Sequence, residues 1–254
     1  MPSAAGPAWC DRVLSLAALL ALWWGAARLA AAPHLLPPPP AVLGFLWRDL
    51  RHGDMAYNFA VTLARVAAAF AVSMVLGSSI GYLTGRSRRA DALADPWLVI
   101  ALNLPALVVI LLAYVWIGLN ELAAVAAVAI VKVPTVIVTV REGVRALDPA
   151  LAELAAAYRL APLLRLRRVV VPQLAPYLAA AGRSGLAVTW KIVLIVELLG
   201  RPDGVGFALN LRFQNFDVAG ILAYGLGFAA IMLTVETVLL QPWERRANAW
   251  RHGA

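Results

Sequence analysis

Long apolar runs dominate the chain, and shorter polar segments separate them. Six of the runs are long enough to cross a lipid bilayer as helices, which takes about 20 residues each. They are Val13–Ala32, Phe59–Gly85, Pro96–Gly118, Leu122–Val140, Leu174–Leu199 and Val218–Leu240. This pattern predicts an all-α integral membrane protein with six transmembrane helices. We expect a single domain over residues 1–254, with its core in residues 59–240 and its first span in residues 13–32.

The first span has an alternative interpretation. Ala30-Ala31-Ala32 resembles a signal-peptide cleavage site, which would remove this run from the mature protein. The apolar run is long for a signal peptide, however, and it contains Trp23 and Trp24. These features favour a retained transmembrane helix.

Composition and charge agree with a membrane protein. Hydrophobic residues make up 62% of the chain and charged residues only 14%, whereas soluble domains carry about 25% charged residues. With both termini in the cytoplasm, 13 of the 22 Lys and Arg residues lie on the inner side and 4 on the outer side. The positive-inside rule therefore predicts cytoplasmic termini. It also accounts for the net charge of +8 without nucleic-acid binding.

The segment Pro33–Asn58 connects the first two spans on the outer side. Its run of four prolines, residues 37–40, indicates a stiff and extended connector. Behind it, Ala41–Leu50 is predicted to form a short amphipathic helix on the outer surface.

The longest cytoplasmic segment, residues 141–173, contains a second short helix. Asp148 and Pro149 are typical of a helix N-cap and first turn, and apolar residues follow at helical spacing until Pro162 interrupts them. Such a helix lies parallel to the membrane and leaves an apolar stripe that requires a partner. The alternative is a helix that merely rests on lipid headgroups.

Two short motifs stand out in this segment, Glu153-Leu154-Ala155 and the ending Val169-Val170-Val171-Pro172. They resemble the Glu-Ala-Ala and Ile-x-Leu-Pro pattern of the EAA loop in binding-protein-dependent ABC importer permeases. Leu154 replaces the first alanine, and Arg159 stands where the family has a glycine, which places the turn at that position in question.

The resemblance extends over about residues 35–240. Asn103-Leu104-Pro105, Trp116-Ile117-Gly118 and Gly204-Val205-Gly206 look like the nitrate, sulfonate, taurine and bicarbonate branch of these permeases. It implies a bacterial inner-membrane subunit that imports a small anion, such as a sulfonate, taurine or nitrate. A pyrimidine-type thiamine precursor is the alternative substrate.

The resemblance also implies partners and a coupling site. The partners are two copies of an ATPase subunit, a second copy of this chain, an external substrate-binding protein and membrane lipid. The implied ATPase-coupling residues are Glu153, Leu154, Ala155, Tyr158, Arg159, Leu160 and Pro162.

We expect no ATP chemistry, catalytic group or cofactor in the chain itself. A phosphate-binding loop requires Gly-Lys-Ser/Thr, and the only lysines are Lys132 in Val-Lys-Val and Lys191 in Trp-Lys-Ile. ATP and Mg²⁺ are therefore expected in the partner ATPase. The three histidines lack metal-ligand spacing, so no metal site is expected.

Ionisable residues inside spans require an explanation, because a charge in lipid is costly. Arg65 and Glu236 lie near span ends, where snorkelling or an internal ion pair accounts for them. Arg183 and Lys191 lie deeper and are candidate pathway residues that offer a transient positive charge to an anion. A partner on another span is the alternative for Lys191. The other pathway candidates are Asn103 and Trp190.

Two other function classes fit the sequence less well. Gly182-Arg183-Ser184-Gly185 matches a motif of membrane serine proteases, but all three histidines lie outside the spans, where none reaches Ser184 as a base. A secondary transporter would have inverted repeats and no need for a capped cytoplasmic helix.

Overall fold

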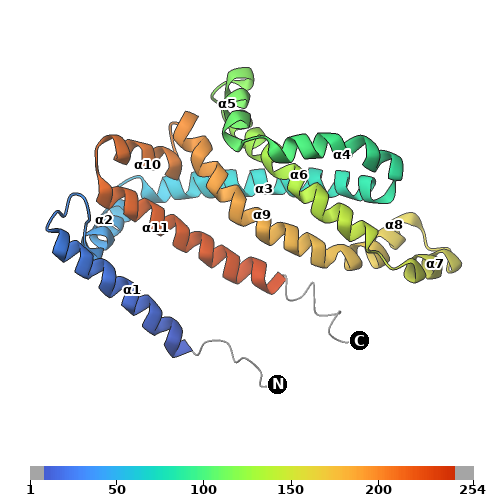
Figure 1. Ribbon diagram of the computed structural model, residues 1–254, viewed down its shortest axis with the longest axis horizontal. Helices are drawn as coiled ribbons and strands as arrows, with labels where there is room; N and C mark the ends of the chain where they lie inside the picture. The colour runs from blue at the N-terminus through green and yellow to red at the C-terminus, as the bar shows by residue number, and fades with distance from the viewer. Residues whose placement is uncertain (1–8, 244–254) are drawn as a thin grey trace.

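The computed structural model describes residues 9–243, and all regular secondary structure in that range is helical (Figure 1). The helices are α1 (Trp9–Ala30), α2 (Pro39–His52), α3 (Met55–Arg86), α4 (Arg88–Asn103), α5 (Ala106–Ile117), α6 (Glu121–Arg145), α7 (Pro149–Ala157), α8 (Pro162–Arg165), α9 (Val171–Gly200), α10 (Val205–Gln214) and α11 (Val218–Val235), with π-helical turns at Leu166–Val170 and Glu236–Leu240. Five helical segments in the described range are long and apolar enough to cross a membrane, and the bent pair α4–α5 would make a sixth. The predicted all-α membrane fold is confirmed.

Close backbone contact between α3 and α6 forms the centre of the bundle. Gly77, Gly81 and Gly85 recur every four residues and so lie on one face of α3. A Cβ atom built on Gly81 would lie 2.8 Å from the carbonyl oxygen of Ile137, and one on Gly85 would lie 2.6 Å from Cβ of Val144. Lipid supplies no hydrophobic drive between helices, so small residues that admit close packing stabilise such contacts. On its other side α6 packs against α9.

The predicted third span, Pro96–Gly118, is wrong as a continuous helix. The structure breaks it at Leu104 and Pro105, and α4 and α5 meet there at an angle of 98°. The break follows from Pro105, which disfavours helical geometry at Leu104 and donates no backbone hydrogen bond. Figure 1 shows α5 projecting from the bundle, while α4 lies along α3 and α6.

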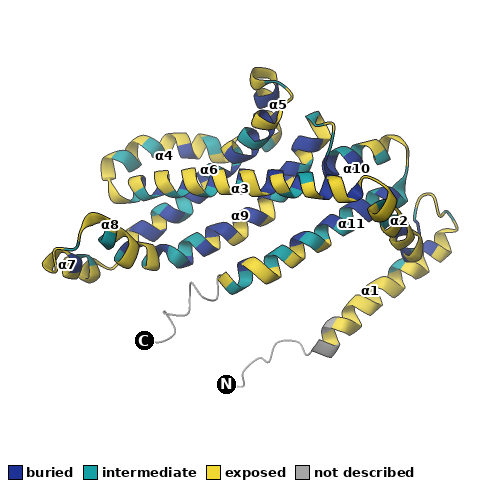
Figure 2. Ribbon diagram, turned by 180° about the vertical axis from the view of Figure 1, so that it is seen from behind, coloured by how far each residue is buried: buried dark blue, intermediate teal, exposed yellow. Residues whose placement is uncertain are grey.

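Helix α1 lies at the edge of the molecule. Only 6% of the residues in its apolar stretch, Val13–Ala30, are buried, and Figure 2 shows the helix almost entirely exposed. It meets the rest of the chain at the α1–α2 connection, where the indole nitrogen of Trp23 donates to the carbonyl oxygen of Pro37 over 3.1 Å. This arrangement leaves most of α1 for contact with lipid or with another chain.

The two short surface helices predicted from the sequence lie at opposite ends of the bundle (Figure 1). Helix α2 contains the predicted Ala41–Leu50 and packs against α11, where the Tyr224 hydroxyl donates to the Asp49 carboxylate over 2.7 Å. Helix α10 lies at the same end as α2, and α7 and α8 lie at the other. The fold therefore presents distinct surfaces at its two ends.

The close approach of α3 to α6 predicts that Gly81→Ala destabilises the protein. The added methyl group would overlap a backbone oxygen of α6 that cannot move without the helix, at a cost of about 1–3 kcal/mol. We expect a clear loss of melting temperature in detergent. The matched control is Gly225→Ala on α11, where no atom lies within 4 Å of the added Cβ. Equal melting temperatures of the two variants would contradict this packing.

Candidate functional site

Helix α7 begins where the sequence predicts. The Asp148 side chain accepts a hydrogen bond from the backbone N–H of Ala150 over 2.8 Å, and Pro149 occupies the first turn. The Asp148 N–H in turn donates to the side-chain oxygen of Gln173 at the start of α9, over 2.9 Å. These bonds satisfy free backbone groups at the helix N-terminus and attach it to the bundle.

The chain forms a tight turn at the C-terminal end of α7, although Arg159 stands there in place of the family's glycine. Arg159 adopts a positive φ of 47°, a left-handed conformation that glycine favours. The N–H of Leu160 donates to the carbonyl of Ala155 over 3.0 Å, and that of Arg159 to the carbonyl of Ala156 over 2.9 Å. This is the Schellman pattern of helix C-termini. The turn therefore forms with arginine at the glycine position, at a conformational cost of about 1–2 kcal/mol.

The predicted coupling residues divide between two sides of this short helix. Ala155 is buried and Leu160 is half-buried, so both pack against the protein itself. The side chains of Glu153, Leu154 and Tyr158 are exposed, Tyr158 to 74%. Five of the predicted coupling residues are exposed, and two exposed leucines lie beside them: the set is Glu153, Leu154, Tyr158, Arg159 and Pro162 with Leu151 and Leu163. We call these seven residues the α7 surface.

A cavity of about 240 Å³ lies between α7 and the bundle. Its walls include Tyr82 and Arg86 of α3, Ala152 of α7, Arg165 of α8 and Gln173 in the first turn of α9. Helix α7 is therefore attached at its N-terminal end and buries Ala155, with space beside Ala152.

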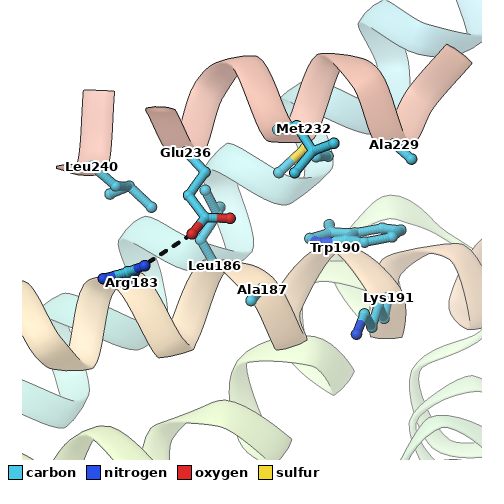
Figure 3. A pocket seen from close by; sticks show the side chains of 10 residues that line it. Arg183, Leu186, Ala187, Trp190, Lys191, Ala229, Met232, Glu236 and Leu240 are labelled. Atoms are coloured by element: carbon cyan, nitrogen blue, oxygen red, sulfur yellow. Dashed lines mark hydrogen bonds and ion pairs between the residues drawn. The ribbon is translucent and has the colours of Figure 1, made fainter. Parts of the chain in front are cut away.

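The pathway candidates of the sequence do not all lie together. Arg183, Trp190 and Lys191 line one cavity of about 290 Å³ between α9 and α11 (Figure 3). Arg183 pairs there with Glu236 of the π-helical turn that follows α11, at 3.4 Å. Asn103 lies elsewhere, at the end of α4, and its side-chain amide donates to Val99 of its own helix over 2.8 Å.

Lys191 has its amine 5.7 Å from the centre of the Trp190 ring, within the range of a cation–π contact. Together with Arg183 it makes the α9–α11 cavity polar on one side, while Leu186, Ala229 and Met232 make other parts of the wall apolar. Glu236 belongs to the same lining and pairs with Arg183, so the cavity wall carries charges of both signs.

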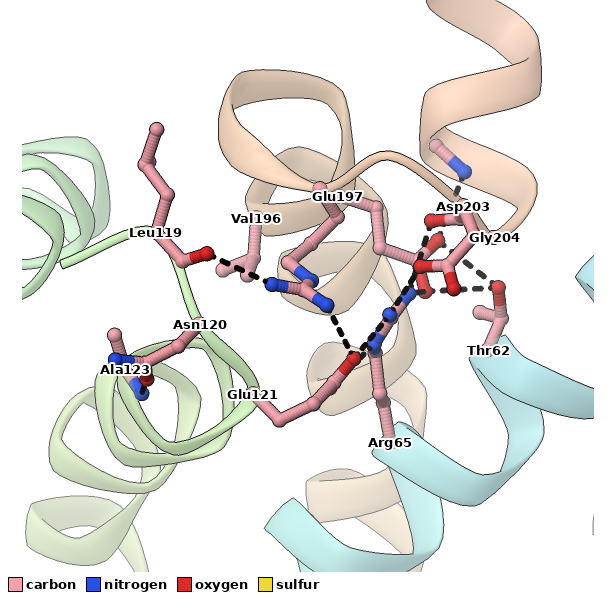
Figure 4. Close-up of polar contacts among 12 residues, drawn as sticks. Thr62, Arg65, Leu119, Asn120, Glu121, Ala123, Val196, Glu197, Asp203 and Gly204 are labelled. Carbon is pink, nitrogen blue, oxygen red and sulfur yellow. Dashed lines mark hydrogen bonds and ion pairs between the residues drawn. The ribbon is translucent and has the colours of Figure 1, made fainter.

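At the end of the bundle that holds α10, a network of charged side chains surrounds the buried Arg65 and Glu197 and joins four helices (Figure 4). Arg65 of α3 is only 4% exposed, and its guanidinium pairs with Glu197 of α9 at 2.8 Å and with Glu121 of α6 at 2.6 Å. It also pairs with Asp203, in the turn before α10. Arg201 pairs with Glu121 at 2.6 Å. We call these five residues the Arg65 cluster.

Glu197 is fully buried and supports the start of α10. Its carboxylate accepts hydrogen bonds from the Thr62 hydroxyl and from the backbone N–H of Gly206, each over 2.9 Å. Gly204 has a φ of 99°, and a Cβ atom on Gly206 would lie 2.1 Å from the carbonyl oxygen of Leu194. Glycine is therefore required at both positions of the Gly-Val-Gly motif.

The sequence indicated Arg65 only as a charge near the end of a span. The internal ion pair proposed as one explanation for Arg65 is present, and the available signal was the gathering of three acids and two arginines near span ends. Residues 9–243 contain no group of three or more His, Cys, Asp or Glu side chains arranged to hold a metal ion.

The Arg65 cluster predicts a large effect of Arg65→Met. Glu197 would keep its burial but lose its ion-pair partner, which costs about 3–5 kcal/mol. We expect a strong fall of the melting temperature of the detergent-solubilised protein. Arg48→Met on α2 is the control, because Arg48 is exposed and its guanidinium bonds to Gly44 of its own helix. If both variants melted like the wild type, the cluster would have no stabilising role.

Comparisons with known proteins agree with this architecture. Residues 73–240 match the family described as the binding-protein-dependent transport system inner membrane component. A probable ABC transporter permease protein of Brucella abortus is 26% identical over 81% of this chain and 82% of its own length. A putative aliphatic sulfonates transport permease protein of Bacillus subtilis is 24% identical over 96% of this chain and 88% of its own.

Two further similarities bear on substrate class and fold. The taurine transport system permease protein of Escherichia coli is 24% identical over 77% of this chain and 70% of its own. A chain from the crystal structure of an amino acid ABC transporter with histidines superposes with a TM-score of 0.61, at 23% identity, over 76% of this chain and 93% of that one. Because the family match covers more than half of the residues, the chain belongs to the inner-membrane permease components of binding-protein-dependent ABC transport systems.

Proposed function

We propose that this permease imports a small anionic solute into the cytoplasm and is driven through α7 by a separate ATPase subunit. The observation that carries the proposal is the α7 surface itself. A capped nine-residue helix stands at one end of the bundle and exposes Leu154 and Tyr158 next to Glu153. An exposed apolar patch on a rigid element is suited to dock a partner and to transmit its displacement.

Energy must come from another chain under this proposal. The sequence has no Gly-Lys-Ser/Thr loop for nucleotide phosphates. With one α7 surface per chain, two ATPase subunits require two copies of the permease. The proposed assembly is therefore a homodimer of this chain with two ATPases, which hold the ATP and Mg²⁺.

The opposite end of the bundle is suited to an external substrate-binding protein. Phe213 and Phe216 are exposed on and just after α10, and α2 lies at the same end. In this arrangement α7 faces the cytoplasm, and both termini are cytoplasmic. The excess of arginine around α7 agrees with that orientation.

The proposed substrate class is a small organic or inorganic anion. Relatives of this chain are named for aliphatic sulfonates, taurine and bicarbonate. Arg183, Trp190 and Lys191, which line one cavity, are proposed pathway residues. Asn103 remains a weaker candidate, because it lies apart from them.

A charge reversal on α7 tests the coupling. We expect the Glu153→Lys variant to insert and fold normally. The amount of ATPase that copurifies with it should fall about tenfold or more, because the substitution places a new positive charge in the proposed interface. Asp54→Lys, at the N-terminus of α3, is the matched control and should retain the ATPase fully. Wild-type ATPase retention and uptake in Glu153→Lys would refute the assignment.

Two substitutions of Arg159 distinguish the effect of the left-handed turn on ATPase association from the effect of the guanidinium charge. Arg159→Gly suits a φ of 47° and should keep or improve ATPase association. Arg159→Val places a β-branched residue in the left-handed region, where it is strongly disfavoured, and should weaken association. Equal loss in both variants would mean that the arginine charge, rather than the turn, makes the contact.

A further inference from the structure

Lys132 is a buried cation in the middle of α6. It is 4% exposed and lies 11 residues after Glu121, the first residue of the helix. At 1.5 Å per residue this is about 16 Å along the axis, which is near the centre of a hydrocarbon layer about 30 Å thick. A lysine at such a depth is costly and therefore indicates a function.

Other cations of the bundle that lie away from solvent have acidic partners, whereas Lys132 has none in the described part of the chain. The buried Arg65 pairs with three carboxylates, and the half-buried Arg141, at the opposite end of the bundle, pairs with Asp91 and Asp95. Among residues 9–243, no carboxylate lies within the 4.0 Å of an ion pair from the Lys132 amine, and no hydrogen bond from it occurs. The charge of Lys132 is uncompensated in this conformation.

The amine lies against a small residue of α9. A Cβ atom built on Gly185 would lie 3.1 Å from Cε and 3.7 Å from Nζ of Lys132, and 3.5 Å from the Phe70 ring of α3. Gly185 thus leaves room for the lysine side chain at the junction of α3, α6 and α9. This is a different side of α9 from the one that lines the α9–α11 cavity.

A second unsatisfied polar group lies one helical turn further along α9. Thr189 is completely buried, and its hydroxyl has no hydrogen-bond partner. Residues four apart share a helix face, so Thr189 follows Gly185 on the side facing Lys132. Because α6 and α9 run in opposite directions (Figure 1), the lysine side chain, which leans toward the N-terminus of its helix, leans toward Thr189.

Neither group has a hydrogen-bond partner among residues 9–243, so both are available to an acceptor from outside the chain. Lys132 offers only donors, and the threonine hydroxyl can also donate. An anionic oxygen would accept from both and would compensate the positive charge, which a neutral water cannot do.

From this geometry we infer that Lys132 and Thr189 form a binding site for an anionic oxygen of the transported solute. The inference rests on the proposed import of a small anion and adds where its charge is held. Lys132 is only 4% exposed in this conformation, so the solute gains full access to the amine when α6 and α9 separate during transport. The solute class is a sulfonate or carboxylate-type monoanion.

The test uses the full chain purified with its ATPase, and the probes are taurine, ethanesulfonate and bicarbonate in the millimolar range. Their effect on the melting temperature is compared with that of chloride at equal ionic strength. For the wild type we expect at least one probe to raise the melting temperature by about 2 °C or more, since a ligand that binds only the folded state stabilises it. Lys132→Met should abolish this shift, and Thr189→Val should reduce it. Arg89→Gln, which removes an exposed charge in the first turn of α4, should keep it.

The melting temperature without added anion provides an independent measurement. Removing a buried and uncompensated charge should leave Lys132→Met at least as stable as the wild type. If Lys132→Met instead unfolds, the amine has a structural partner and the inference is wrong. It is also wrong if no probe stabilises the wild type, or if Lys132→Met responds like the wild type. Retention of the ATPase reports separately on α7, so failure of the anion site would leave the coupling proposal intact.

Discussion

The pairing of Arg65 with Glu197 is the interaction on which the arrangement of this bundle depends. Lipid offers no water to solvate either charge, so each must find its partner within the protein. Arg65 links α3, α6 and α9, and Glu197 extends the linkage to the first amides of α10. A buried pair of this kind is not a large net source of stability, but loss of one partner is expensive. It therefore fixes which helices meet at this end of the bundle.

The two ends of the molecule differ in how firmly they are held. At the α10 end, charged hydrogen bonds and two required glycines join elements far apart in the sequence. At the α7 end, the short helix is attached through Asp148, Gln173 and Ala155, and a cavity lies behind it. Because few contacts attach α7 to the bundle, the helix can move relative to the bundle while its own capping hydrogen bonds stay intact. In the proposed cycle, α7 transmits the motion of the ATPase to helices that are tied together at the far end.

Sequence reasoning succeeded where the signals were local. Hydropathy located the spans, and Asp148 and Pro149 predicted the start of α7 because capping depends on neighbouring residues. The end of α7 was predicted too late, because the helix stops at Ala157 and Pro162 instead begins α8. Sequence reasoning failed at residues 96–118, since hydropathy records that a segment is apolar but not that Pro105 turns it by 98°.

The Arg65 cluster was missed for a different reason. The acidic partners of Arg65 lie 56, 132 and 138 residues away, and no spacing rule connects them. The separation of Asn103 from Arg183 and Lys191 likewise depends on which helices pack together.

The position of α7 relative to the membrane is the most direct test of the whole account. Cys10 is the only cysteine in the sequence, so a Cys10→Ala background with Tyr158→Cys gives a single thiol on the α7 surface. A membrane-impermeant maleimide should label this thiol in inside-out vesicles, and bound ATPase should protect it. Intact right-side-out vesicles should remain unlabelled. Labelling of this thiol from the outer side would contradict the assignment of α7 as the cytoplasmic coupling element.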